Sequence, residues 1–288
     1  MKAIFSREVR SYFQTMLGPV FIAILTAMTG IYFMVLNLVN GYPYFSATIG
    51  NMLFMLMVAV PILTMKSFAE DRHSHAEQLM LSAPVTVWDI VLGKYFAMVA
   101  VFAIPCLLFC LCPLIIMTGG TASLGSDWAA IGLYFLLGCA YIAIGMFLSS
   151  ITESQLIAAV ASFGVLLVLY LWDALAEYFP TSARGNLIGM IVIVALLAAL
   201  YYALARNPYV AVGVFVILTV ALIIAYLVSS TTFEGLMAKT LGTFDVYTGF
   251  VELANYRLLD LTAVVRYLSL AFFGVFLTVQ SLQKRRWA

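Results

Sequence analysis

The residue types best suited to chemistry in this sequence are two histidines with acidic neighbours. His73 and His75 are separated by one residue, and Asp71 and Glu77 lie close by in the chain. A zinc site needs three or four such ligands, but residues two apart point to different faces of a helix, and no fourth ligand is specified. The pattern is typical of surface histidines, and we expect no metal site.

Four cysteines offer a second candidate for metal chemistry. Cys106, Cys110 and Cys112 are closely spaced, and they lie, like Cys139, inside long apolar stretches. Metal binding would require thiolates, and a charged group is costly inside a membrane. A free cysteine in such surroundings behaves as a small hydrophobic residue, so we expect these four to pack in the core.

The dipeptide Gly93-Lys94 resembles the end of a phosphate-binding P-loop. That loop has the pattern G-x-x-x-x-G-K-[ST], but here the first glycine is missing and Tyr95 replaces the Ser or Thr. The hydrolase patterns G-x-S-x-G and H-E-x-x-H are also missing from the sequence. We therefore expect no catalytic residue, no bound cofactor and no ATP hydrolysis by this chain.

These residues belong to a very apolar chain. Of its 288 residues, 65% are hydrophobic and only 9% are charged, whereas a soluble domain has about 25% charged residues. The net charge of +1 argues against nucleic acid as a partner, because binding to phosphates needs clustered basic residues. The composition predicts an all-α polytopic membrane protein that forms a single transmembrane domain over residues 1–288.

Charged residues delimit the expected membrane spans, because a helix that crosses about 30 Å of hydrocarbon needs about 20 largely uncharged residues. The uncharged stretches predict about eight spans, of which the sixth and seventh form a hairpin. The turn between the first two is marked by Asn37, Asn40, Gly41 and Pro43. The expected spans cover residues 16–38, 48–65, 95–117, 128–149, 154–172, 187–205, 209–228 and 267–282.

The basic residues predict the orientation of these spans. With both termini in the cytoplasm, ten of the 14 Lys and Arg residues face the cytoplasm, as the positive-inside rule requires. We expect a multi-pass protein of the bacterial cytoplasmic (inner) membrane. The four basic residues expected outside are Arg184, Lys239, Arg257 and Arg266.

Residues 1–15 predict an amphipathic helix that lies along the membrane surface. Apolar side chains recur there at helical spacing, with polar residues between them. The helix is either a simple anchor or a lever that is joined to the first span. As a lever it would act through Phe5, Arg7, Val9, Arg10, Tyr12 and Phe13.

Two segments between spans are long enough to carry function. The cytoplasmic loop 66–94 contains two capping-box patterns, at residues 74–77 and 86–89. They predict a short helix that ends before Pro84 and a second helix that continues into the third span. The first is either a solvated connector or a docking element for a cytosolic partner. Residues 229–262 predict outer amphipathic or re-entrant helices, which cap the bundle or line a substrate path.

Residues 70–72, 77–85 and 90–95 resemble the coupling-helix region of permease subunits of exporter-type-2 (ABC-2 type) ABC transporters. Residues 148–158 and 260–287 are similar to the gliding-motility-associated branch of that class. The likeness covers residues 1–173 and 244–288. Two departures are the pair His75-Ala76, where the family has Gly-Thr, and the hairpin 187–228, which is extra to the usual six-span core.

The resemblance implies a permease that couples ATP hydrolysis, with ATP and Mg bound by a separate P-loop ATPase, to export or extraction of an unidentified, amphipathic substrate. It also implies a second permease, identical or homologous, and a membrane protein with an extracytoplasmic domain. One alternative is a scaffold or mechanical transmission subunit; another is an ATP-independent carrier or channel, disfavoured by the lack of charges within the spans. The expected ATPase-coupling residues are Glu77, Gln78, Leu79, Met80, Leu81, Ser82, Ala83, Pro84, Arg72 and Glu153.

Overall fold

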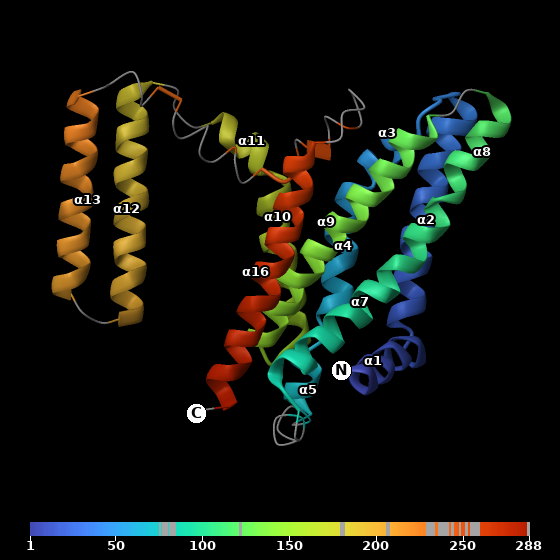
Figure 1. Cartoon of the computed structure of the whole chain (residues 1–288), viewed down its shortest axis with the longest axis horizontal. Helices are drawn as coiled ribbons and strands as arrows, with labels where there is room; N and C mark the ends of the chain where they lie inside the picture. Colours follow the sequence, from blue (N-terminus) through green and yellow to red (C-terminus); the bar gives the residue numbers. More distant parts are fainter. Residues whose placement is uncertain are drawn as a thin grey trace. The chain divides into compact units, whose positions relative to one another are not determined.

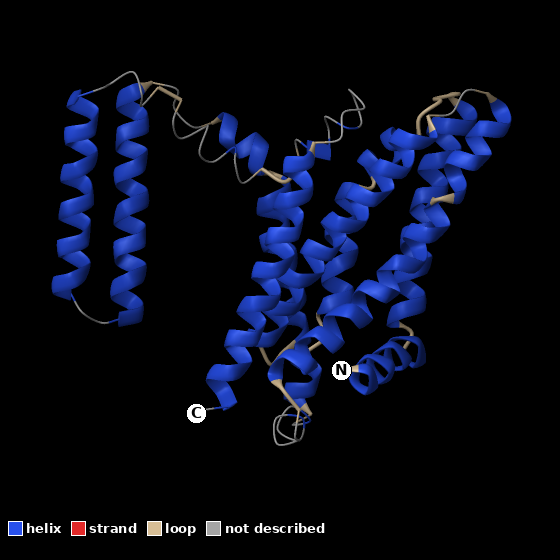
Figure 2. Ribbon diagram, viewed as in Figure 1, coloured by secondary structure: helices blue, strands red, loops and turns tan. Residues whose placement is uncertain are grey.

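In the computed structural model, every regular element among the described residues is a helix (Figure 2). This confirms the all-α fold class. The chain forms two compact units, Met1–Tyr170 with Val246–Ala288, and Leu171–Asp245 (Figure 1). The structure describes residues 1–288 except 75, 77–79, 81–84, 121–122, 179–181, 206–207, 229–233, 236–241, 243–244, 248, 251–252, 254–259 and 287–288.

The first unit holds most of the helices and all of the residues discussed below. Its helices begin with α1, which is joined to α2 by a short turn, and close with α16 at the end of the chain. In order they are α1 (Lys2–Gln14), α2 (Leu17–Phe33), the π-helix η1 (Met34–Val39), α3 (Phe45–Asn51), α4 (Leu53–Thr64), α5 (Ala69–His73), α7 (Val87–Phe109), α8 (Leu111–Gly119), α9 (Leu124–Ile151), α10 (Gln155–Tyr170) and α16 (Leu261–Arg286).

The second unit is built around an apolar hairpin. It contains α11 (Trp172–Glu177), α12 (Ala183–Ala205) and α13 (Pro208–Val228), and α12 packs against α13. These two helices correspond to the expected extra hairpin.

Five helical stretches of the described chain are long and apolar enough to cross a membrane. They are Leu17–Val39, Leu53–His73, Val87–Gly119, Leu124–Ile151 and Leu261–Arg285. Shorter apolar helices occur at Gln155–Tyr170, Ala183–Ala195 and Phe215–Tyr226. Each of the eight expected spans overlaps one of these helices; the number that crosses the membrane stays a prediction.

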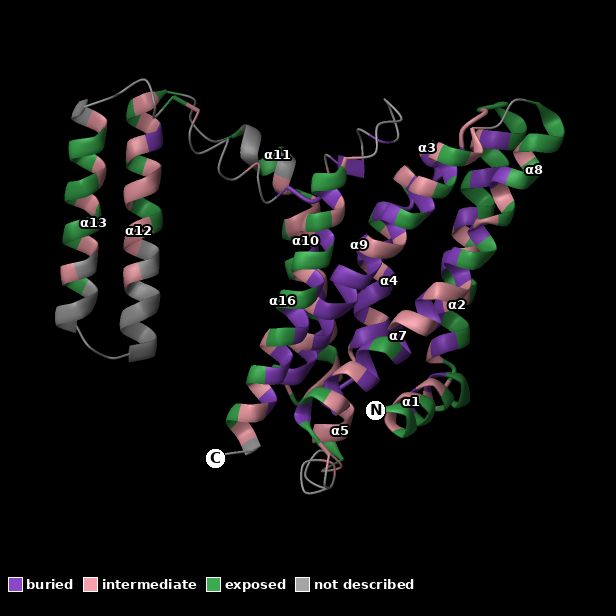
Figure 3. Ribbon diagram, viewed as in Figure 1, coloured by how far each residue is buried: buried purple, intermediate pink, exposed green. Residues whose placement is uncertain are grey.

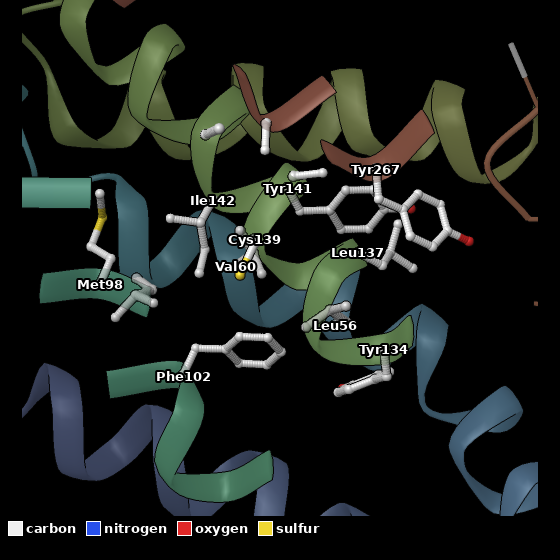
Figure 4. Close-up of a cluster of buried hydrophobic side chains, with 14 of the residues drawn as sticks. Leu56, Val60, Met98, Phe102, Tyr134, Leu137, Cys139, Tyr141, Ile142 and Tyr267 are labelled. Carbon is white, nitrogen blue, oxygen red and sulfur yellow. The ribbon is translucent and has the colours of Figure 1, made fainter. Parts of the chain in front are cut away.

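Helix α9 is the centre of the first unit, because it packs against α16, α4, α7 and α10. Buried side chains concentrate where these helices meet (Figure 3). Phe102 of α7 lies among side chains of α4 and α9 in Figure 4, and its ring is 5.9 Å from that of Tyr134. A Cβ at Gly138 would overlap the Phe102 ring, and one at Gly274 would lie 2.9 Å from the Ala143 carbonyl carbon. Small residues thus let the helices approach closely, as is common within membranes.

The π-helix η1 ends at a turn that side chains hold in place. Asn37 donates to the carbonyls of Tyr42, at 2.8 Å, and Tyr44, at 3.1 Å, and its own amide oxygen accepts from Thr48 at 2.6 Å. Asn37 therefore lies inside a helix, although the sequence indicated it as part of the turn. Asn37 still stabilises the turn, because its side-chain amide donates to two carbonyls of residues that follow the helix.

Asp127, in the first turn of α9, connects that helix to α3. Its Oδ1 accepts a hydrogen bond from the Ser46 backbone N–H at 3.1 Å, and the residue is fully buried. The first N–H groups of a helix have no partner within the helix, so this carboxylate satisfies one of them in α3.

Candidate coupling site

The candidate site begins with a lysine inside a long apolar helix. The Thr86 hydroxyl accepts from the Asp89 N–H at 3.2 Å and donates to the Asp89 carboxylate at 2.6 Å, which starts α7 at Val87 as the capping pattern predicts. Lys94 therefore lies within α7, where its side chain is only 2% exposed. The sequence predicts a helix that continues through this residue into the third span, which α7 confirms, and a span that begins at residue 95.

Three acceptors from different parts of the chain surround the Lys94 ammonium group. Its Nζ lies 2.6 Å from Asp71 Oδ2 in α5, 3.2 Å from Glu8 Oε1 in α1 and 2.7 Å from the Ser67 carbonyl. The Phe68 ring covers it at 5.1 Å. The buried ammonium thus donates a hydrogen bond to the Ser67 carbonyl and forms ion pairs with two carboxylates. The Lys94 cluster, defined as Lys94, Glu8, Asp71 and the Ser67 carbonyl, joins α1, α5 and α7.

Glu8 belongs to the face of α1 that packs on the rest of the unit. Ile4, Glu8 and Tyr12 recur at four-residue spacing; Glu8 and Tyr12 are buried, and the Tyr12 hydroxyl donates to the Leu63 carbonyl at 3.2 Å. A Cβ at Gly93 would lie 3.0 Å from Ile4 Cγ2, so the glycine allows α1 to approach α7 closely. This stripe places Glu8 directly against Lys94.

The charge state of Glu8 is set by its surroundings. Burial raises the pKa of this carboxyl, but Lys94, and Arg7 with its Nη2 at 2.6 Å from Glu8 Oε1, together hold the pKa below its usual range. Glu8 is therefore an anion at neutral pH, and the ion cluster is intact.

The other side of α5 is bound to the end of α9 by Ser149. Its Oγ accepts hydrogen bonds from the Phe68 and Ala69 N–H groups, both at 3.1 Å, and donates to the Met65 carbonyl at 3.1 Å. Ser149 is fully buried. A single hydroxyl on α9 thus satisfies backbone groups at the start of α5, which lies about 80 residues earlier.

Arg72 adds a second connection between α5 and the α9 end. Its Nη1 donates to the Ile151 carbonyl at 2.7 Å, and its Nε lies 3.2 Å from Glu153 Oε1. Arg285 of α16 also donates to the Ile151 carbonyl, at 3.4 Å. The structure therefore brings together Arg72 and Glu153, two of the expected coupling residues. The neighbouring residues Asp71 and Arg72 contact different helices: Asp71 contacts α7, and Arg72 contacts the end of α9.

Most of the expected coupling helix lies outside the described residues. Met80 is described, and its Sδ accepts from Arg7 Nη2 at 3.3 Å, which connects the loop to α1. The other lever residues have different environments on α1: Arg7, Arg10 and Phe13 are exposed, and Phe5 and Val9 are half-buried. Outside the described residues are Glu77, Gln78, Leu79, Leu81, Ser82, Ala83 and Pro84, together with His75.

Glu8, Ser149 and the role of Lys94 were not predicted from the sequence. Two signals could have found the ion pair: a glutamate on the same helical stripe as Ile4 and Tyr12, and a lone lysine within an apolar stretch. No sequence signal identifies Ser149, because its partners are backbone groups far away in the chain.

The arrangement connects α5 to helices on two sides. Within the described part of the chain, no group of three His, Cys, Asp or Glu residues is placed to hold a metal ion. Helix α5 is bound on one side to α1 and α7 through Lys94, and on the other side to α9 through Ser149 and Arg72. Movement of the loop would therefore reach both sets of helices.

The chain matches the model of a known protein family. A family model described as "ABC-2 family transporter protein" matches residues 3–185, which is more than half of the chain. The matched residues include α1, the loop 66–94 and α9, while nearly all of the hairpin of α12 and α13 lies beyond them. The gliding-motility-associated branch is not distinguished by this match and stays a prediction. The chain matches no curated protein and no solved structure.

Proposed function

The chain belongs to the ABC-2 transporter family and is a permease subunit of an ABC transporter; from this premise we propose that ATP hydrolysis in a partner subunit is coupled to this chain through the Lys94 cluster. Members of this family work with an ABC ATPase, and this chain is a multi-pass membrane protein. ATP and Mg would be bound by the ATPase.

The observation that carries the proposal is the buried Lys94 ammonium between Glu8 and Asp71. Removing charges from water is expensive, and a buried ion pair offsets this cost only where its geometry is good and hydrogen bonds add to it. Here the compensated charge joins a surface helix, a loop helix and a long apolar helix. A connection of this kind makes α1, α5 and the start of α7 move together.

The proposed mechanism starts with the ATPase on the cytoplasmic loop 66–94. Closure of the ATPase would push on α5 and the residues that follow it. The Lys94 cluster would carry this push to α1 and α7, and Ser149 and Arg72 would carry it to α9. A relative tilt of α7 and α9 would switch access between the two sides of the membrane, because packed helices shift between discrete arrangements.

Further parts of the proposal concern substrate and partners. We propose export or extraction of an amphipathic substrate, a second permease that is identical or homologous, and a membrane partner with an extracytoplasmic domain. We place the chain in the bacterial cytoplasmic membrane with both termini in the cytoplasm, which puts the Lys94 cluster on the ATPase side.

The test is purification of the tagged full-length chain in mild detergent, followed by mass spectrometry and an ATPase assay. We expect a P-loop ATPase in stoichiometric amount, and ATPase activity that increases in the complex. Reversal of the pair, by Lys94→Glu with Asp71→Lys, is expected to preserve more of that activity than Lys94→Glu alone. Recovery of the chain without an ATPase would refute the proposal. Equal ATPase activity in the wild-type complex and in both variants would refute coupling through the cluster.

A further inference from the structure

A cavity of about 210 Å³ lies beside the Lys94 cluster, between α1, α5 and α7. A single water needs only about 10–15 Å³ of such space, so the cavity has room for a ligand of several non-hydrogen atoms. Its lining contains three cations and three anions: Arg7, Lys66, Lys94, Glu8, Glu70 and Asp71.

Among the described residues, two of the three cations have donors without a partner. The Lys94 ammonium is already paired with two carboxylates and a carbonyl, as described above. Lys66 Nζ has one described ion-pair partner, Glu70 Oε2 at 3.1 Å, and a side chain that is 16% exposed. In the described part of the chain, Arg7 binds Glu8 and Met80 through Nη2 alone, and its side chain is 55% exposed. Arg7 and Lys66 are therefore able to bind an anionic group that enters the cavity.

The cavity also offers acceptors. Ser67 lines it, and the buried Ser67 hydroxyl has no hydrogen-bond partner among the described residues. Buried polar groups in native structures are nearly always paired, so this hydroxyl indicates that water or a ligand occupies the space. Glu70, with a side chain that is 41% exposed, provides a carboxylate at the same cavity.

The balance of charges selects the ligand class. A simple anion would meet three carboxylates, and a simple cation would meet three basic groups, so neither is favoured. A zwitterion has a phosphate, which can lie against the basic side chains, and an ammonium, which can lie against the carboxylates. Its binding leaves the net charge of the cavity unchanged. The ammonium would be a primary one, because trimethylammonium groups are held by aromatic cages, and Tyr12 is the only aromatic residue in the described lining.

We propose that this cavity binds the headgroup of a zwitterionic phospholipid with a primary ammonium, such as phosphatidylethanolamine. Arg7 and Lys66 would bind the phosphate, and Glu70 and Ser67 would bind the ammonium. A lipid is favoured over a free metabolite because α1 leads at once into the apolar helix α2, and the apolar side chains at this junction are exposed, Phe13 by 45% and Met16 by 79%. Acyl chains would cover these side chains. The proposal goes beyond coupling to an ATPase and does not depend on it.

The test uses the full-length protein in nanodiscs of phosphatidylcholine that contain one tenth phosphatidylethanolamine or one tenth phosphatidylglycerol. After extraction into mild detergent, native mass spectrometry counts the retained lipids. We expect about threefold or greater enrichment of phosphatidylethanolamine over its bulk fraction, equivalent to about 0.7 kcal/mol. The double variant Lys66→Gln/Glu70→Gln keeps the charge balance and should abolish the enrichment. Arg10→Gln, an exposed residue of α1 outside the cavity lining, is the matched control.

Three other results would each overturn the assignment of a phospholipid headgroup to this cavity. Equal enrichment of phosphatidylglycerol would show an anion site without a role for the ammonium. Competition by soluble phosphoethanolamine, without enrichment of the lipid, would identify a free metabolite as the ligand. No enrichment in the wild-type protein would show that the cavity holds only water, and this comparison needs no variant to fold.

Discussion

Replacement of Lys94 by methionine tests the physical basis of the coupling site. The substitution leaves Glu8 and Asp71 without the buried ammonium that lies 3.2 Å and 2.6 Å from their oxygens. Removing one partner of a buried pair costs about 3–5 kcal/mol. The side chains of Glu8 and Asp71 are 12% and 19% exposed, so water compensates part of the loss. Arg7 remains on Glu8, and we therefore expect the lower end, about 3 kcal/mol.

Thermal unfolding in mild detergent measures this loss. For a chain of this size about 3 kcal/mol lowers the Tm by about 6–12 °C. The control is Lys66→Met, because the Lys66 ion pair with Glu70 is partly exposed and contributes less than about 1 kcal/mol. The triple variant Glu8→Gln/Asp71→Asn/Lys94→Met removes every charge together and should recover most of the Tm, since no charge is left buried alone.

Two results would refute the reasoning. One is an equal Tm for Lys94→Met and Lys66→Met, which would mean that the cluster is solvated. The other is a triple variant no more stable than Lys94→Met, which would mean that the lost free energy comes from packing and not from unpaired charge.

Further predictions concern the neighbouring hydrogen bonds. Ser149→Ala leaves two buried N–H groups unpaired and should cost about 1–3 kcal/mol, whereas Ser150→Ala loses only a bond to the Phe147 carbonyl of its own helix; equal loss of Tm in both would contradict this. Thr86→Ala should destabilise the first turn of α7 by about 1 kcal/mol, measured as about fivefold faster hydrogen exchange of its amides. The pKa of Glu8 is lower in the folded chain, so its stabilisation is complete above the ordinary value of about 4.3 and is lost as the pH falls below it; Glu8→Gln should remove this acid-dependent part of the Tm.

The sequence predicts the apolar helices well and the site poorly, and Lys94 shows why. Charge is a good marker of where apolar helices end, because an isolated charge is costly in hydrocarbon. The marker fails where a distant part of the chain compensates the charge, as Glu8 and Asp71 do for Lys94. Asn37 is a similar case: asparagine is typical of turns, but here its amide holds the turn from inside a helix. Thr86 and Asp89 were predictable because all partners of a cap are local.

Helix α9 also has a consequence for the order in which the chain assembles during synthesis. Its two ends provide Asp127 to the start of α3 and Ser149 to the start of α5, each about 80 residues after the backbone groups that it satisfies. Protein synthesis adds about 5–20 residues per second, so these backbone groups are made about 4–16 s before their partners. The starts of α3 and α5 therefore lack these partners until α9 has been synthesised, and the packing of α9 completes both.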